Sequence, residues 1–325
     1  MDGYADHLRK LKSLLIVTSL QKRRDLQALA QVEALTLALD WTPQADLMIA
    51  PATWEYVVRT RGYDPKLVFC HPKVLLAAPT TSLYYRGLTG LSIKAAKGYV
   101  GSIEGLEVGK PGSKLRDEKA LKMAQLYNTF ICTVIQGTAD WTLEDGKRTV
   151  IATLGITLDG IMRNQVGSIA EARIRSLVWQ WLQGNDLILS PTPSEAPADE
   201  EPLPTTCELK GNIVMRFASE PDIAFFKRTH RGLVLAAVVE IKGGTDPAGA
   251  LERYGAATKS FQHALSENPR CKNFFLSAIY TDELTRRIEA DRLVERPYDI
   301  IELLEQPNKR EEFLQELFHY GLRLV

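Results

Sequence analysis

Apolar residues recur every three or four positions near the start of the chain, between Tyr4 and about Leu39, among polar and basic residues. This spacing places them on one side of a helix, so it predicts helices over that stretch. Between residues 40 and 160, glycine and proline interrupt the pattern. Within that segment, residues 114–135 have helical spacing, and the run 148–157 predicts a strand. The first 160 residues are therefore predicted to be mainly helical.

The second half of the chain has clearer patterns. Ser168 and Glu171 have the spacing of a capping box, which predicts a helix that begins there and ends near Gly184. Three strands are predicted next, at 211–217, 222–226 and 232–241. The short turn between the last two makes them an antiparallel hairpin. The last run is almost wholly apolar, as expected for a strand that is buried on both faces.

A second helix is predicted from Asp246, a good N-cap residue, to about Ser266. Its apolar line consists of Leu251, Tyr254, Thr258, Phe261 and Leu265. Further strands are predicted at 272–280 and 298–304, and a last helix at 310–318. The order α-β-β-β-α-β predicts an α/β (α+β) core in the second half of the chain.

Composition changes most sharply at residues 190–205, a stretch with five prolines, four acidic residues and no basic one. Such a segment has little apolar surface to bury, so it predicts a loop. We divide the chain into a mainly helical N-terminal region, residues 1–160, and a second domain, residues 161–325, that contains this loop.

Overall composition excludes several classes of protein. The chain has 325 residues, 45% hydrophobic and 25% charged, as folded proteins of one or two domains do. Forty basic and forty acidic residues cancel, so contact with nucleic acid would depend on local charge. No apolar run approaches the roughly 20 residues of a membrane span. We expect a cytoplasmic protein without membrane contact, whose four scattered cysteines are free buried thiols.

Three charged residues lie at the ends of the predicted hairpin strands. Asp222 opens one strand, and Glu240 and Lys242 close the next, with 17 residues between the two carboxylates. Because antiparallel strands bring the start of one beside the end of the other, the two carboxylates are expected at one sheet edge. Side chains alternate along a strand, so Glu240 and Lys242 share a face. Ile241 turns into the core and leaves its carbonyl free.

These groups suit a magnesium site. Two carboxylates and a carbonyl oxygen are hard ligands for Mg²⁺, which keeps several waters and accepts substrate phosphate. An ammonium group beside the ion can orient or help to deprotonate the attacking water. Asp222, Glu240 and Lys242 therefore indicate phosphodiester hydrolysis. The alternative is a turn residue and two surface charges, since acidic-x-Lys tripeptides occur at four other places in the chain.

The pattern P-D-(x17)-E-x-K on this order of elements resembles the PD-(D/E)xK nuclease superfamily. More narrowly, E-P-D-I-A-F-F and V-V-E-I-K-G-G-T-D-P-A-G-A-L-E-R-Y-G-A-A-T-K-S-F resemble XcyI-type type II restriction endonucleases, which cut within CCCGGG. The resemblance covers about 167–280. It implies a restriction-endonuclease-like core, Asp222 and Glu240 as Mg²⁺ ligands and Lys242 as the catalytic lysine.

Glu171 has two interpretations. Members of the superfamily often carry a metal-proximal glutamate on the helix before the sheet, and Glu171 lies in the corresponding predicted helix. The resemblance therefore implies a catalytic role for it. Its position in the capping box explains it equally well as a residue that only caps the helix.

Base recognition is expected on the helix after Lys242. Glu252 and Arg253 lie off its apolar line, and a carboxylate next to an arginine can read cytosine N4 and guanine O6/N7. Relatives that recognise CCGG cores often carry R-(D/E)-R here, but Leu251 replaces the first arginine. The alternative is a pair of solvent-facing charges. Lys259 is either a phosphate contact or a solvated charge.

The resemblance implies double-stranded DNA as the partner and a homodimer, since two-fold sites are cut by two-fold dimers. The N-terminal helices with Lys22-Arg23-Arg24 would supply the dimer surface or backbone contacts; the alternative is that these three residues are solvated charges on a helix. No nucleotide cofactor is expected, because Gly105 to Lys110 falls one residue short of a phosphate loop. The alternatives to a restriction enzyme are a structure-specific repair or junction nuclease and a non-catalytic DNA-binding module.

Overall fold

A computed structural model describes residues 3–42, 44–191 and 203–324. Contacts between backbone positions divide the chain into two compact units. We term Ser13–Ile161 the helical unit, and Met1–Lys12 together with Met162–Val325 the sheet unit. Most of the loop predicted at 190–205 lies outside the described residues. No described helix is long and apolar enough to cross a membrane.

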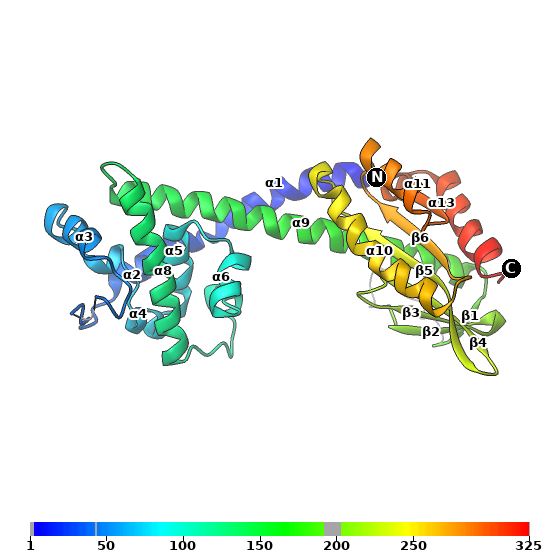
Figure 1. The fold of residues 1–325 in the computed structure, drawn as a ribbon, viewed down its shortest axis with the longest axis horizontal. Coiled ribbons are helices and arrows are strands. Elements are labelled where there is room, and N and C mark those ends of the chain that lie inside the picture. The colour runs from blue at the N-terminus through cyan, green and yellow to red at the C-terminus, as the bar shows by residue number, and fades with distance from the viewer. Residues whose placement is uncertain (1–2, 43, 192–202, 325) are drawn as a thin grey trace. The chain divides into compact units, whose positions relative to one another are not determined.

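The helical unit is built from short helices around a core of its own (Figure 1). Its α-helices are the last part of α1 (Tyr4–Lys22), α2 (Arg24–Ala34), α3 (Pro51–Trp54), α4 (Pro72–Ala77), α5 (Ser82–Thr89), α6 (Ile93–Val100), α7 (Glu104–Glu107), α8 (Asp117–Gly137) and the first part of α9 (Leu143–Gly184). Single turns of other helix types cover Glu55–Thr60, Pro65–Leu67 and Pro79–Thr81. The helices predicted near the N-terminus and at 114–135 are thus confirmed.

One continuous helix, α9, overturns two predictions. The segment 148–157 is helical, because its buried positions Val150 and Thr153 and the buried Gly146 recur at helical spacing. The hydroxyl of Thr153 donates to the carbonyl of Thr149, one turn back, so its branched side chain is satisfied within the helix. Ser168 and Glu171 lie in the middle of α9 and cap nothing. The helix does end at Gly184, as predicted.

The sheet unit contains one seven-stranded sheet with strands in chain order. The strands are β1 (Ile188–Ser190), β2 (Thr206–Leu209), β3 (Ile213–Phe217), β4 (Ile223–Thr229), β5 (Gly232–Lys242), β6 (Lys272–Ser277) and β7 (Arg296–Asp299). Neighbours from β1 to β5 are antiparallel, whereas β5, β6 and β7 are parallel. The α-β-β-β-α-β core is confirmed as α9, β3, β4, β5, α10 and β6.

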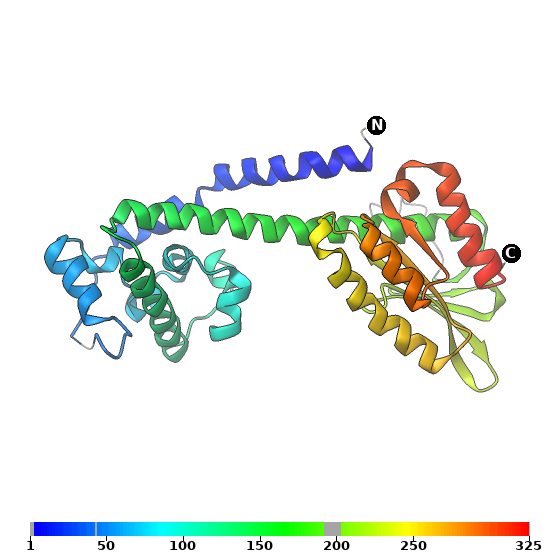
Figure 2. The same ribbon diagram turned by 45° about the horizontal axis from the view of Figure 1, so that its top comes forward.

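Helices cover both faces of this sheet (Figure 2). They are α10 (Ala250–Glu267), α11 (Asp282–Asp291), α12 (Ile300–Glu305) and α13 (Pro307–Leu314), with short turns at Lys210–Asn212, Pro247–Gly249 and Gln315–Gly321. Helices α10 and α11 pack on one face, and α9, α12 and α13 pack on the other. Strand β5 lies between the two cores, which explains its almost wholly apolar sequence.

Several details of the sheet unit differ from the predictions. The buried line of α10 is Ala250, Tyr254, Ala257, Phe261 and Ala264. The predicted line had Leu251, Thr258 and Leu265 where the structure buries the preceding residue, an alanine in each case. The small alanine side chains let the helix approach the sheet closely. The predicted strand 298–304 is mostly α12, with β7 just before it. Strands β1 and β2 and helix α11 were not predicted. All four cysteines are free and buried, as expected.

Candidate active site

The β4–β5 hairpin places Asp222 opposite Glu240. The strands pair Ile223 with Val239 and Ala224 with Val238, and this register, continued by one residue, brings Asp222 to Glu240. Opposed residues of antiparallel strands share a face, so both carboxylates lie on the α10 side at the edge of the sheet. Both residues are buried, with exposed fractions of 5% for Asp222 and 1% for Glu240.

The Lys242 ammonium group joins the two carboxylates. Its Nζ lies 2.5 Å from Glu240 Oε2 and 3.4 Å from Asp222 Oδ2. The Lys242 side chain is 20% exposed, so one side of the group still meets solvent. Asp222, Glu240 and Lys242 therefore form one compact cluster, open at the sheet edge.

Ile241 contributes through its main chain. Its side chain is buried in the core on the α9 face, as predicted. Its N–H donates a hydrogen bond of 2.6 Å to Asp222 Oδ2. The N–H and C=O of one strand residue point to the same side, so the Ile241 carbonyl is also directed toward Asp222. The pairing of β4 with β5 ends at Ile223 and Val239, so no residue of β4 is paired with Ile241. The Ile241 carbonyl is therefore not used in the β4–β5 ladder.

Burial and mutual charge tune the cluster. Burial raises the pKa of Glu240 above its ordinary value of 4.5, and Lys242 only partly offsets this effect. Burial alone would lower the pKa of Lys242, but the charges of Asp222 and Glu240 outweigh it and raise that pKa above 10.5. Lys242 is therefore an ammonium group at neutral pH, and it acts as a hydrogen-bond donor and a positive charge.

Helix α9 brings Glu171 to the same edge of the sheet. A Cβ added at Gly243, the residue after Lys242, would lie 2.3 Å from the Ala170 Cβ and 3.2 Å from the backbone of Gly167. This close approach sets Glu171, next in α9, beside the cluster. Burial raises the pKa of Glu171, and the charges of Asp222 and Lys242 also act on it. Since Glu171 lies inside α9, the capping explanation no longer applies.

The residues present fit a divalent ion. The Glu240 Oε1 atom is buried and has no partner at ordinary hydrogen-bonding geometry, although a buried carboxylate oxygen normally has one; the Ser260 hydroxyl lies close enough to lower the pKa of this carboxyl group. A bound cation would satisfy it, together with Asp222 and the Ile241 carbonyl. Among the described residues no group of three or more His, Cys, Asp or Glu side chains is placed to hold a metal. Such an ion would therefore rest on two carboxylates, main-chain oxygen and water.

Comparison with known proteins identifies the family. The chain matches the XcyI restriction endonuclease family over residues 56–319, most of its length. It belongs to the XcyI restriction endonuclease family. It is also 26% identical over 216 residues to the type II restriction enzyme Cfr9I of Citrobacter freundii, which covers 63% of this chain. The chain spans about 62% of the length of that relative. The predicted family is confirmed, and its match extends well into the helical unit.

Of the three residues predicted to contact DNA in this XcyI-family chain, two are exposed and one is turned back toward the loop before α10. Glu252 and Lys259 are exposed on α10, as predicted. Arg253 folds back instead, and its Nη2 donates to the main-chain oxygen of Asp246 at 2.5 Å. Gly244 and Gly249 leave the space for its guanidinium group, which lies 3.1 Å and 2.6 Å from where their Cβ atoms would be. In this structure Arg253 therefore braces the loop after Lys242.

Sequence reasoning missed Arg175. It lies one helical turn after Glu171 on α9 and contacts both Glu171 and the turn before Asp222. An arginine four residues after a glutamate is common on helices as a surface pair. Only the packing of α9 against the β3–β4 turn distinguishes this one.

Proposed function

We propose that this chain is a Mg²⁺-dependent type II restriction endonuclease that hydrolyses double-stranded DNA at a CCCGGG-type palindrome. The observation that carries the proposal is the buried pair of carboxylates at the sheet edge, with the Lys242 ammonium group within 3.4 Å of both. Family membership supports the activity, and the relative Cfr9I is named as a type II restriction enzyme. We place the protein in the cytoplasm, where such an enzyme meets its DNA.

In this mechanism Asp222, Glu240 and the Ile241 carbonyl would hold Mg²⁺. The ion, when bound, supplies positive charge that stabilises the phosphoryl oxygens and acidifies the attacking water. Lys242 donates hydrogen bonds and orients the attacking water. The Ile241 N–H keeps the Asp222 carboxylate turned toward the edge. Glu171, beside the cluster on α9, would add a third carboxylate, which attracts the ion or its water shell.

Site recognition is proposed to rest on α10. Exposed Glu252 can accept a hydrogen bond from cytosine N4, and Lys259 can contact a phosphate. Arg253 would read guanine after leaving Asp246, a single main-chain partner.

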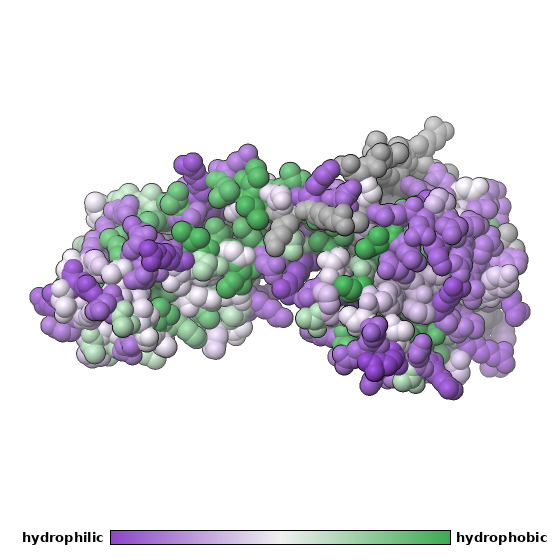
Figure 3. Space-filling view, turned by 90° about the horizontal axis from the view of Figure 1, so that it is seen from above, coloured by the Kyte–Doolittle hydropathy of each residue, from purple (hydrophilic) through white to green (hydrophobic). Residues whose placement is uncertain are grey.

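A homodimer is proposed because each subunit would cut one strand of a palindrome. The helical unit supports this proposal with exposed apolar residues on α1 and α9, and Figure 3 shows hydrophobic side chains exposed on the face that carries these helices. On α1 they are Leu14, Ile16, Val17 and Leu20. Lys22, Arg23 and Arg24 follow directly, so this region would supply dimer contacts, backbone contacts or both.

Plasmid cleavage tests the proposal. A supercoiled plasmid with one CCCGGG site should become linear with protein and Mg²⁺, and a plasmid with the site altered should stay intact. Asp222→Ala and Lys242→Ala should abolish cutting and keep site binding. Lys210→Ala is the matched control, since Lys210 belongs to a tripeptide of the same form but pairs with Asp186 at the surface. This variant should cut normally.

Other products would favour the alternatives. Random fragments, or cutting only at junctions and flaps, would indicate a structure-specific nuclease. Binding without cleavage in either Mg²⁺ or Mn²⁺ would indicate a non-catalytic module. Full cutting by both site variants would refute the assigned roles.

A further inference from the structure

One arginine on α9 contacts both the proposed metal edge and the neighbouring glutamate. The Nη2 atom of Arg175 donates to the main-chain oxygen of Asp222 at 3.1 Å and to that of Ala218. The same atom lies 2.5 Å from Glu171 Oε1. The guanidinium carbon lies 5.3 Å from the centre of the Phe217 ring. The side chain is 22% exposed, so these contacts are largely shielded from water.

These contacts hold the turn that presents Asp222. The turn closes on itself through a hydrogen bond of 3.3 Å from the Ala218 N–H to the Asp222 carbonyl. Arg175 binds the carbonyls at both ends of this turn. On the other side, the Asp222 carboxylate accepts from the Ile241 N–H. Asp222 is thus fixed at its main chain from α9 and at its carboxylate from β5.

Arginine is suited to this place for geometric reasons. Its flat guanidinium group lies against the Phe217 ring while Nη2 reaches the main-chain oxygens and Glu171, whereas the compact, strongly hydrated ammonium of lysine has no flat face to pack on the ring. The positive charge of Arg175 also lowers the pKa of Glu171, which offsets the effect of the Asp222 charge on that carboxyl group.

We propose that Arg175 is a positioning residue for the metal site: it fixes the Asp222 turn and the Glu171 carboxylate at one distance from each other. The inference rests on the proposed function, because it assumes that Asp222 holds a divalent ion. In this proposal Arg175 acts through Asp222 and Glu171 and not as a ligand of the ion.

Metal binding in the absence of DNA tests this role. Titration calorimetry with Mn²⁺ would compare the native chain with Arg175→Lys and Arg175→Ala. Residues that orient metal ligands typically contribute 10–100-fold to metal affinity. We expect Arg175→Lys to raise the Kd for Mn²⁺ about tenfold, and Arg175→Ala to raise it further. Binding of a CCCGGG duplex in EDTA should change less than twofold, since the base contacts are proposed on α10 and not on α9.

Arg173→Lys is the matched control. Arg173 lies on the same helix two residues earlier, is exposed and contacts the Tyr4 ring. It should bind Mn²⁺ like the native chain. Unchanged Mn²⁺ affinity in Arg175→Lys, or an equal loss in Arg173→Lys, would overturn the inference. If Arg175→Ala fails to fold, as its melting curve would reveal, Arg175→Lys decides.

The two proposals fail in different ways. If the native chain binds Mn²⁺ but cuts no DNA, the proposed function fails, while the comparison of variants still decides what Arg175 does for the metal. If the native chain cuts its site and Arg175→Lys keeps native metal affinity and native cutting, only the inference about Arg175 fails.

Discussion

At the scale of single residues, the candidate site buries the Glu240 carboxylate, and the positive charge of Lys242 only partly offsets the cost of this burial. Glu240 is almost fully buried, and one of its carboxylate oxygens lacks a partner. This arrangement destabilises the ionised carboxylate in the metal-free chain, and a divalent cation would relieve it.

The raised pKa of Glu240 leads to a prediction about pH. The folded chain binds the Glu240 proton more tightly than the unfolded chain does. The contribution of this group to the free energy of unfolding therefore falls as pH rises from 4.5 through the raised pKa. Protons also compete with metal at Glu240, so Mn²⁺ affinity should decline already above pH 4.5 as pH is lowered. Calorimetry between about pH 5 and 8 measures this decline.

Glu267→Gln provides the control for this titration, since Glu267 is an exposed carboxylate at the end of α10, whereas Glu240 is buried on β5. Its Mn²⁺ profile should match that of the native chain. Mn²⁺ affinity that stays constant down to pH 4.5 would contradict the prediction.

Gly243 shows how one small residue sets the distance from strand to helix. Gly243→Ala places a methyl group 2.3 Å from Ala170, so α9 must move away from the strand end. We expect a loss of about 1–3 kcal/mol in the free energy of unfolding, typical of overpacking. Mn²⁺ binding should weaken as well, because Glu171 and Arg175 move with α9. Urea denaturation and calorimetry measure the two effects.

Gly255→Ala is the opposite case. Gly255 lies inside α10, and no atom lies within 4 Å of its added Cβ. Alanine there should stabilise the chain by about 0.5–1 kcal/mol, since glycine is a poor helix former. Equal stability effects of the two substitutions would show that the contact between Gly243 and Ala170 is not tight.

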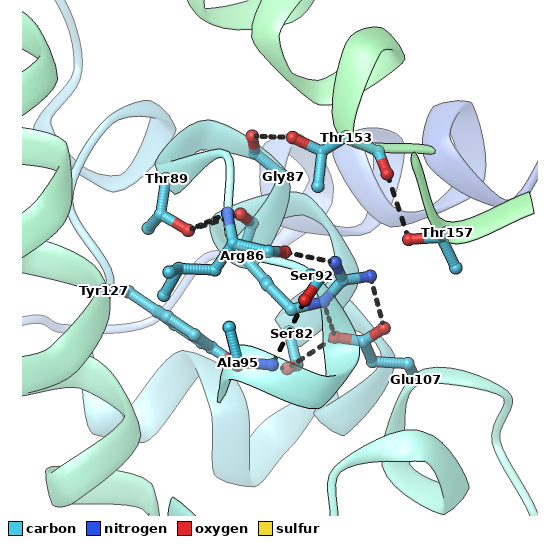
Figure 4. A network of polar contacts seen from close by, with 11 residues as sticks. Ser82, Arg86, Gly87, Thr89, Ser92, Ala95, Glu107, Tyr127, Thr153 and Thr157 are labelled. Carbon is cyan, nitrogen blue, oxygen red and sulfur yellow. Dashed lines mark hydrogen bonds and ion pairs between the residues drawn. The ribbon is translucent and has the colours of Figure 1, made fainter. Parts of the chain in front are cut away.

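At the scale of elements, the helical unit depends on a buried ion pair. Arg86 on α5 donates two hydrogen bonds, of 2.7 and 2.9 Å, to the Glu107 carboxylate on α7 (Figure 4). Both side chains are at most 3% exposed, and the Ser82 hydroxyl also bonds Glu107. The network therefore ties two short helices together, neither of which would be stable alone.

Removing one partner of this pair should be costly. Arg86→Met leaves the Glu107 carboxylate buried without its counter-charge, so we expect a loss of about 3–5 kcal/mol. The double variant Arg86→Met with Glu107→Leu should recover most of it, since two apolar residues leave no buried charge. Tryptophan fluorescence can follow the unfolding of the helical unit alone if Trp179 and Trp181 of the sheet unit are replaced by phenylalanine. The remaining tryptophans, Trp41, Trp54 and Trp141, all lie in the helical unit. A double variant no more stable than the single one would contradict this account.

At the scale of the whole molecule, the exposed apolar residues of α1 predict association. Leu14 and Leu20 are 59% and 68% exposed, and apolar surface of this kind marks interaction sites when it is contiguous. Replacing both with glutamate should shift a dimer to monomer in sedimentation velocity. The monomer should nick rather than linearise the plasmid. Tyr99→Glu is the control, because Tyr99 is 67% exposed but lies on α6.

A native chain that sediments as a monomer at all concentrations would contradict the dimer. A dimer that survives the double substitution would instead place its interface elsewhere on the chain.

The family and the cluster of Asp222, Glu240 and Lys242 at the sheet edge could be predicted from the sequence. Strand pairing in a hairpin is a local property: alternation has a period of two and the partners follow each other in the chain. The spacing alone therefore predicts that Asp222, Glu240 and Lys242 lie together. In the structure the carboxylates of Asp222 and Glu240 are both within hydrogen-bonding distance of Lys242 Nζ.

Tertiary structure alone decided what surrounds that edge. Which segments pack together decides four features: the continuity of α9, the position of Glu171, the contacts of Arg175 with Glu171 and Asp222, and the contact of Arg253 with Asp246. Arg175 and Asp222 are 47 residues apart, and no local periodicity links them. A β-branched run such as 148–157 satisfies strand and helix patterns alike, so burial against the rest of the unit selects the helix. Local sequence pattern thus determined which groups form the candidate site, and long-range packing determined how they are held.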